Sequence, residues 1–169
     1  MVIAHLPSGY LLSRFLFDRL GLSSGSTGIL MFLGLLGAIF PDFDLIYFYW
    51  VDHGLVHHHR YFIHWPSFWL LLSIISVLWL KLSPLWISAS TVKYAPLFFS
   101  LGGLSHVFLD AYVGDLWLFA PFYDKSFSLF HVPARYKPWW LNFIWHWTFI
   151  AELLLCVWAG IVYKKRGLL

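Results

Sequence analysis

His106 and Asp110, in the segment SHVFLDAY, have the residue types and the spacing of a metal-binding pair. Residues four apart on a helix project from the same face on successive turns. An imidazole nitrogen and a carboxylate oxygen placed in this way can bind zinc or a similar divalent ion. The alternative is a capping aspartate beside an unrelated histidine. The surrounding segment is apolar, and ionisable residues inside such helices are costly, which favours the ligand role.

A second segment, residues 51–66, holds five of the nine histidines of the chain. We expect one or two of them, His59 and His64, to be metal ligands. Their separation does not place them on one helix face, so they can meet only if the chain turns between them. Arg60 could hold a phosphate or carboxylate oxygen with two hydrogen bonds. The other polar residues are expected to form a solvated loop: Asp52, His53, His57 and His58.

Two carboxylates end an apolar run in the segment PDFD, residues 41–44. One interpretation is a helix stop with solvated side chains, since proline and aspartate are common at helix boundaries. In the other, Asp42 or Asp44 binds or bridges a metal ion while its neighbour supports the site from outside. His5, in AHLPSGY, is a weaker candidate ligand near the start of the chain.

The elements that carry these residues are apolar enough for an integral membrane protein. Of the 169 residues, 60% are hydrophobic and 11% are charged. Soluble domains are roughly 25% charged. The length fits a single domain, residues 1–169. The basic residues are scattered, which argues against a nucleic-acid-binding patch. The single cysteine, Cys156, excludes an internal disulfide.

Four segments are predicted to span the cell membrane, since a span needs roughly 20 mainly apolar residues. They cover residues 21–40, 61–80, 95–109 and 139–163. A fifth candidate, residues 3–20, carries Arg14, Asp18 and Arg19, and either spans or lies in the interface as an amphipathic helix. We therefore expect an all-α, multi-pass helical bundle.

The distribution of basic residues predicts which ends of the spans share a side of the membrane. Lysine and arginine are enriched in cytoplasmic loops. With residues 164–166 in the cytoplasm, seven basic residues lie inside and four outside. The candidate ligands then converge on the outer face. Glu152 lies in the last span, six residues after His146 and on another helix face, so it is expected to pair with another helix.

Taken in order, AHLPSGY, PDFD, HRYFIH and SHVFLD resemble the bacterial membrane-bound, metal-dependent hydrolases, some of which are described as LexA-regulated. The same order is similar to that of the zinc-dependent phospholipase C and single-strand nuclease group. Those are all-α enzymes that cleave phosphoester bonds. The resemblance implies that the metal ligands come from His5, Asp42, Asp44, His59, His64, His106 and Asp110.

The chain departs from that group in two places. The group also uses its mature N-terminal amine and a later His-x-x-x-Glu/Asp pair. Here Met1 leads the chain without a clear processing site, and His146 is followed four residues later by Ile150. We therefore expect one or two metal ions, not three.

These features predict a hydrolase that acts on a phosphoester or lipid-linked substrate at the outer face of the bilayer. A divalent metal, zinc by the ligand types, would lower the pKa of a bound water to about 7. Asp42 or Asp44 could accept the proton of that water. Arg60 could stabilise developing negative charge.

Two other classes of protein fit the same residues. A divalent-metal transporter or sensor would use the same ligands. However, the inner halves of the spans offer few polar groups beyond Arg14, Asp18 and Glu152, which favours a surface site over a conduit. A structural or adaptor protein would have the polar loop hydrated and without metal.

Overall fold

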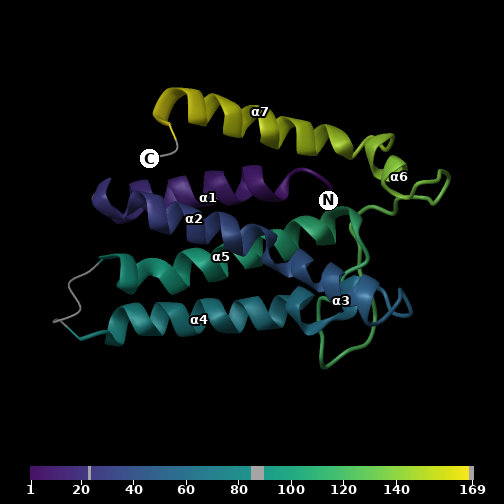
Figure 1. Ribbon diagram of the computed structural model, residues 1–169, viewed down its shortest axis with the longest axis horizontal. Coiled ribbons are helices and arrows are strands. Elements are labelled where there is room, and N and C mark those ends of the chain that lie inside the picture. The colour runs from purple at the N-terminus through teal and green to yellow at the C-terminus, as the bar shows by residue number, and fades with distance from the viewer. Residues whose placement is uncertain (23, 85–89, 168–169) are drawn as a thin grey trace.

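Long helices lie side by side in the computed structural model, which describes residues 1–22, 24–84 and 90–167 (Figure 1). They are α1 (His5–Leu20), α2 (Thr27–Ile39), α4 (Pro66–Leu82), α5 (Ser90–Val113) and α7 (Phe149–Arg166). Two short helices, α3 (Asp44–Trp50) and α6 (Trp140–Ile144), and four 3-10 turns lie between them. Within these ranges one isolated bridge joins Leu116 to Phe127, and there is no strand. The expected all-α class is confirmed.

Two helical segments of the described chain are long and apolar enough to cross a membrane, Thr27–Trp50 and Thr91–Val113. The predicted count of four strong spans is therefore not reproduced. Helix α4 is apolar but has 17 residues, which at 1.5 Å per residue is shorter than a hydrocarbon core of roughly 30 Å. Helix α7 has 18 residues, but it begins near Glu152 and ends in three basic residues.

Small residues allow α2 and α5 to pack closely. A Cβ atom on Gly37 would lie 2.1 Å from the carbonyl oxygen of Phe99, and one on Gly102 would lie 2.3 Å from that of Gly34. Side chains cannot occupy either position, so both contacts require glycine. Small residues serve the same purpose in many membrane helix pairs, whose association depends on packing. The backbones of α2 and α5 are therefore held in one register beside the site described below.

Apolar side chains fill the space on either side of this pair. Trp69 of α4 is completely buried against Val107 and Ala111 of α5, and its indole N–H donates to the carbonyl of Ile63 at 2.6 Å. On the other side, Tyr10 packs with Met31 and Ala159 and joins α1, α2 and α7. Helix α4 is thereby held on one side of α5, while α1 and α7 lie beyond α2.

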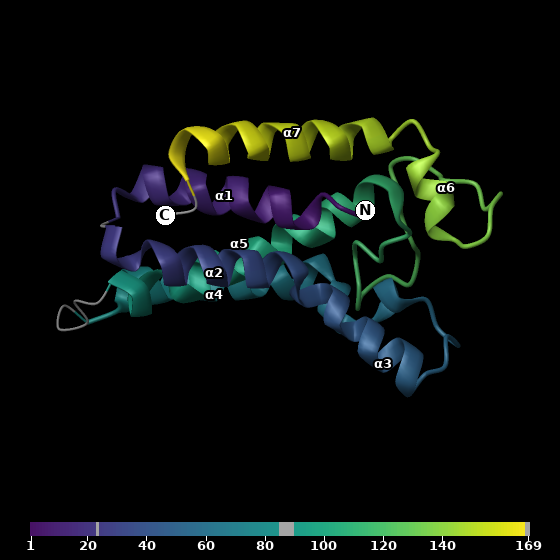
Figure 2. The same cartoon turned by 45° about the horizontal axis from the view of Figure 1, so that its top comes forward.

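The two ends of the bundle differ in composition. The start of α1, the short helices α3 and α6 and their connections gather at one end, and Figure 2 shows α3 projecting from the bundle there. The C-terminal ends of α1, α4 and α7 lie at the other end, and their last turns are basic. The histidine segment, residues 51–66, lies at the end that carries α3 and α6. The candidate ligands and the basic helix ends are therefore separated along the bundle axis.

Candidate metal centre

Four segments that are far apart in the sequence bring histidine and aspartate side chains to one point. These side chains come from the first residue of α1, the junction of α2 with α3, the 3-10 turns η3 (His58–Arg60) and η4 (Phe62–His64), and the second half of α5. Apart from Asp42 and His58, every side chain in this set is buried. The residues brought together include all seven predicted ligands: His5, Asp42, Asp44, His59, His64, His106 and Asp110.

The carboxylate of Asp110 is the centre of this cluster. Its Oδ2 atom lies 2.9 Å from Nε2 of His106. The same oxygen lies 3.7 Å from Nε2 of His59 and 3.7 Å from Nε2 of His64. Its Oδ1 atom lies 3.3 Å from Nε2 of His5. Four imidazole nitrogens therefore face one buried carboxylate, and His106 and Asp110 share one face of α5 as their spacing predicted.

Backbone carbonyls orient two of these rings from behind. The Nδ1 atom of His106 lies 2.7 Å from the carbonyl oxygen of Ala38, and Nδ1 of His59 lies 2.9 Å from that of Asp115. A carbonyl oxygen only accepts, so each Nδ1 carries the hydrogen, and Nε2 of each ring faces Asp110. Metal-binding histidines commonly have such a partner on the second nitrogen.

The two aspartates of PDFD have different positions, which the sequence had left open. Asp44 is buried, and its Oδ2 atom accepts a 2.5 Å hydrogen bond from Nδ1 of His64. Asp42 is 38% exposed, and its Oδ1 atom lies 3.6 Å from Nε2 of His106 and 3.9 Å from Nε2 of His64. Asp42 therefore faces the same side as the candidate ligand atoms, whereas Asp44 orients a histidine from behind.

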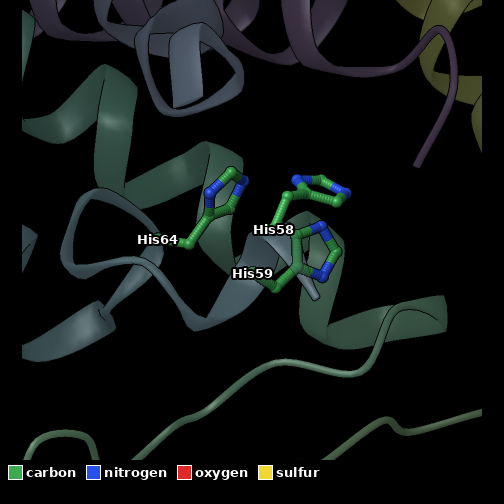
Figure 3. Close-up of side chains that lie close together, drawn as sticks. All are labelled: His58, His59 and His64. Atoms are coloured by element: carbon green, nitrogen blue, oxygen red, sulfur yellow. The ribbon is translucent and has the colours of Figure 1, made fainter. Parts of the chain in front are cut away.

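His58 joins the cluster although it was expected to be solvated. Its side chain is 23% exposed, and Nδ1 lies 3.5 Å from Oδ1 of Asp44. The turns η3 and η4 reverse the chain, so the ring centroids of His59 and His64 come within 4.6 Å, as a turn between them would require. The rings of His58, His59 and His64 lie close together in Figure 3. Sequence spacing alone carried no signal for His58, because it becomes half-buried only through the fold of these two turns.

The cluster has the properties of a site for a cation. Among the described residues, Nε2 of His64, Nε2 of His106 and Oδ2 of Asp110 are buried without a hydrogen-bond partner. Leaving such atoms unpaired costs on the order of 1–3 kcal/mol each. The ligand atoms of His5, His106 and Asp110 lie within 4.8 Å of one another, as do those of two overlapping groups: His58, His59 and His64; Asp42, His64 and His106. These buried groups could hold a metal ion.

The environment of His59 keeps its ring in the form that binds metal. Burial lowers the pKa of the His59 imidazole well below its usual value, although the nearby Asp110 carboxylate opposes the shift. The ring is therefore neutral near pH 7, and a neutral imidazole is the ligand form. A Cβ atom on Gly114 would lie 2.7 Å from Cε1 of His59, so glycine at this position leaves room for the ring.

The first residue of the chain also lies beside the cluster. The amine nitrogen of Met1 is 2.5 Å from Oδ1 of Asp110. The carbonyl oxygen of Met1 lies 3.2 Å from Nε2 of His5. Backbone groups of Met1 therefore pack against the carboxylate of Asp110 and the ring of His5, and both of these side chains belong to the cluster.

Two polar residues discussed above point elsewhere. The guanidinium of Arg60 is paired with Asp124 and lies 5.7 Å from the ring centroid of Trp117, and its side chain is 48% exposed. It belongs to none of the groups that could hold a metal ion, so its predicted role stays a prediction. The Nδ1 atom of His146 is 2.8 Å from the hydroxyl of Thr148, and His146 is likewise outside those groups.

The sequence model of a family described as YdjM inner membrane protein matches residues 1–167. The chain belongs to this family. Neither a curated protein nor a solved structure matches the chain. The description of the YdjM family agrees with the two apolar helices, and together they support a location in the membrane.

In this member of the YdjM family a cavity of about 690 Å³ adjoins the cluster. Sites for small molecules commonly measure roughly 300–1,000 Å³. The residues that line it include Asp42, His58, His59 and Asp110 of the cluster, together with apolar side chains of α3 and α6. These apolar residues are Leu45, Phe48, Tyr49 and Phe143, with Trp139 next to α6. The lining of the cavity therefore contains polar groups of the cluster as well as apolar and aromatic side chains.

Proposed function

We propose that this protein is a metal-dependent hydrolase whose centre lies at the outer face of the cell membrane. The observation that carries the proposal is the arrangement around Asp110, where buried Nε2 atoms face one carboxylate and their Nδ1 atoms are held from behind. A mixed set of imidazole and carboxylate ligands suits zinc. The proposed ligands are His5, His58, His59, His64, His106 and Asp110.

The chemistry follows from the positions of the two aspartates. Zinc, when bound, would polarise the scissile bond and acidify a water molecule. Asp42 faces the cavity, so its Oδ1 atom is the proposed acceptor of the proton of that water. Asp44 is hydrogen-bonded to Nδ1 of His64 and fixes that ring, and this contact favours a supporting role over that of the base.

The cavity supports a phosphoester with an apolar portion, such as a lipid or lipid-linked substrate. The polar residues of its lining at the cluster would face the phosphoester, while Phe48, Tyr49 and Trp139 would contact the apolar portion. We further propose that all five long helices cross the bilayer, with α1, α4 and α7 packed beside α2 and α5. The basic last turns of α1, α4 and α7 would then lie on the cytoplasmic side.

Metal analysis of the purified protein, combined with a hydrolysis assay, tests the proposal. We expect zinc to co-purify with the wild type and to be lost in His106→Ala and Asp110→Ala. His146→Ala is a matched control, because this histidine lies outside the cluster. The variants that lose zinc should also lose hydrolysis of a phospholipid presented in vesicles. Unchanged zinc in both cluster variants would rule out this centre.

A divalent-metal transporter has less support. A conduit requires ligands that continue across the bilayer, and Glu152 is the buried carboxylate of the last helix. Its Oε2 atom already accepts backbone N–H groups of Val2 and Ile3 at 2.8 and 2.7 Å. Zinc flux into proteoliposomes that is abolished in Glu152→Gln would favour transport over hydrolysis.

A further inference from the structure

Glu152, in the first turn of α7, is a buried charge that does not touch the histidine cluster. Its side chain is 2% exposed. The Oε2 atom accepts three backbone hydrogen bonds, from the N–H groups of Val2 at 2.8 Å, Ile3 at 2.7 Å and Ala4 at 3.2 Å. A buried carboxylate is costly unless hydrogen bonds compensate it. These three bonds therefore tie Glu152 to the segment that precedes α1.

This contact reaches the N-cap of α1, Ala4, and the two residues that precede it. The first N–H groups of a helix have no partner within the helix. At the N-cap of α1, Ala4 provides no side-chain hydrogen bond. The carboxylate of Glu152 reaches this end from another helix, and a negative charge there is also favoured by the helix dipole. Glu152 thus stabilises the path of residues 2–4 into α1.

The same path determines where His5 lies. His5 directly follows Ala4, which is completely buried. The His5 ring stacks on the ring of His106, with centroids 3.8 Å apart and an interplanar angle of 18°. Its Nε2 atom lies 3.3 Å from Oδ1 of Asp110. A shift of residues 2–4 would therefore move a proposed metal ligand out of the cluster.

The far end of α7 is held on α1 independently of Glu152. The hydroxyl of Tyr10 donates to the carbonyl of Gly167 at 2.7 Å, and Arg166 pairs with Asp18. The rings of Tyr10 and Tyr163 also meet edge to face. Removing the Glu152 carboxylate should therefore release the start of α1 and leave α7 in place.

We propose that Glu152 is a positioning residue of the metal centre, which acts by holding residues 2–4 so that His5 faces Asp110 and His106. The inference rests on the proposed metal centre. It assigns to Glu152 no contact with metal or substrate. It makes the affinity for metal depend on a side chain near the opposite end of the sequence from His5.

A double-mutant cycle tests this role through the dissociation constant of zinc alone, measured on the full-length protein in detergent. We expect Glu152→Ala to weaken zinc binding about tenfold, within the range of roughly 10–100-fold for groups that support metal ligands. In a His5→Ala background the same change should weaken binding by less than about twofold, because the ligand through which Glu152 acts is gone. A general loss of stability would weaken binding equally in both backgrounds and would overturn the proposal.

Two further variants keep the test decisive. Glu152→Gln retains an oxygen that accepts N–H bonds and removes the charge, so its affinity should lie between those of the wild type and Glu152→Ala. It replaces Glu152→Ala in the cycle if the alanine variant does not fold. Leu153→Ala, at an exposed neighbouring position of α7, is the control and should bind zinc as the wild type does.

The outcomes separate this inference from the proposed function. If both Glu152 variants bind zinc like the wild type while His5→Ala and His106→Ala bind it weakly, the metal centre stands and the positioning role is wrong. If the wild type itself does not bind zinc, the metal centre and the positioning role both fail.

Discussion

The Nε2 atom of His106 lies 2.9 Å from the Oδ2 atom of Asp110, and both side chains are buried. An exposed pair at this helical spacing would contribute only a few tenths of a kcal/mol to its helix, about 0.2–0.5 kcal/mol. Here the carbonyl of Ala38 holds the other nitrogen of the His106 ring at 2.7 Å. The pair is therefore preorganised by a neighbouring helix.

Asp44→Asn should weaken zinc binding about 10–100-fold without removing a proposed ligand atom. The carboxylate accepts a hydrogen bond from Nδ1 of His64, and an amide in its place can present an N–H group to that nitrogen instead. His64 would then turn or change tautomer. The measurement is a zinc titration of the purified variant. Asp52→Asn, in the loop that precedes η3, is the control, and equal affinities of the two variants would contradict the supporting role of Asp44.

Gly114→Ala should lower zinc affinity about tenfold although it introduces only a methyl group. The new Cβ atom would lie 2.7 Å from Cε1 of His59, so the ring must shift from its present position. Gly160→Ala is the matched control, because nothing lies within 4 Å of a Cβ atom there. Zinc titrations of both variants provide the comparison. Wild-type affinity in Gly114→Ala would show that the position of His59 is not important for binding.

Gly102→Ala should destabilise the whole bundle. Its Cβ atom would lie 2.3 Å from the carbonyl oxygen of Gly34 and 2.9 Å from the nitrogen of Ala38, so α2 and α5 must separate. Overpacking of this kind costs about 1–3 kcal/mol in the free energy of unfolding. Thermal unfolding in detergent should give a lower midpoint than for the wild type, whereas Gly25→Ala, with open space around its Cβ position, should not. An unchanged midpoint would mean that the helices are not in close contact here.

Arg60→Ala should leave the zinc content unchanged. The guanidinium is paired with Asp124 and lies over Trp117, outside the groups that could hold a metal ion. His59→Ala, one residue earlier, should lose zinc affinity, so the two variants separate neighbouring positions of η3. Metal analysis of both proteins is sufficient. A loss of zinc in Arg60→Ala would place this side chain closer to the centre than its pairing with Asp124 indicates.

The sequence by itself determined the class of the protein and most of its candidate ligands. In a chain with 60% hydrophobic residues and 11% charged ones, an ionisable side chain within an apolar segment is costly, so it indicates a functional site. The spacing of His106 and Asp110 also specified their common helix face, since helix periodicity is a local property. The types of the ligands and their common end of the bundle could therefore be predicted from the sequence.

Only the tertiary structure decided the roles within the site. Asp42 and Asp44 are two residues apart, yet one faces the cavity and the other holds His64, because η2 (Phe40–Phe43) and α3 direct them differently. The place of His58 beside Asp44 depends on two consecutive 3-10 turns. Glu152 reaches the N–H groups of residues 2–4 across about 150 positions of the chain. Such contacts depend on the packing of distant segments, and no local pattern in the sequence encodes them.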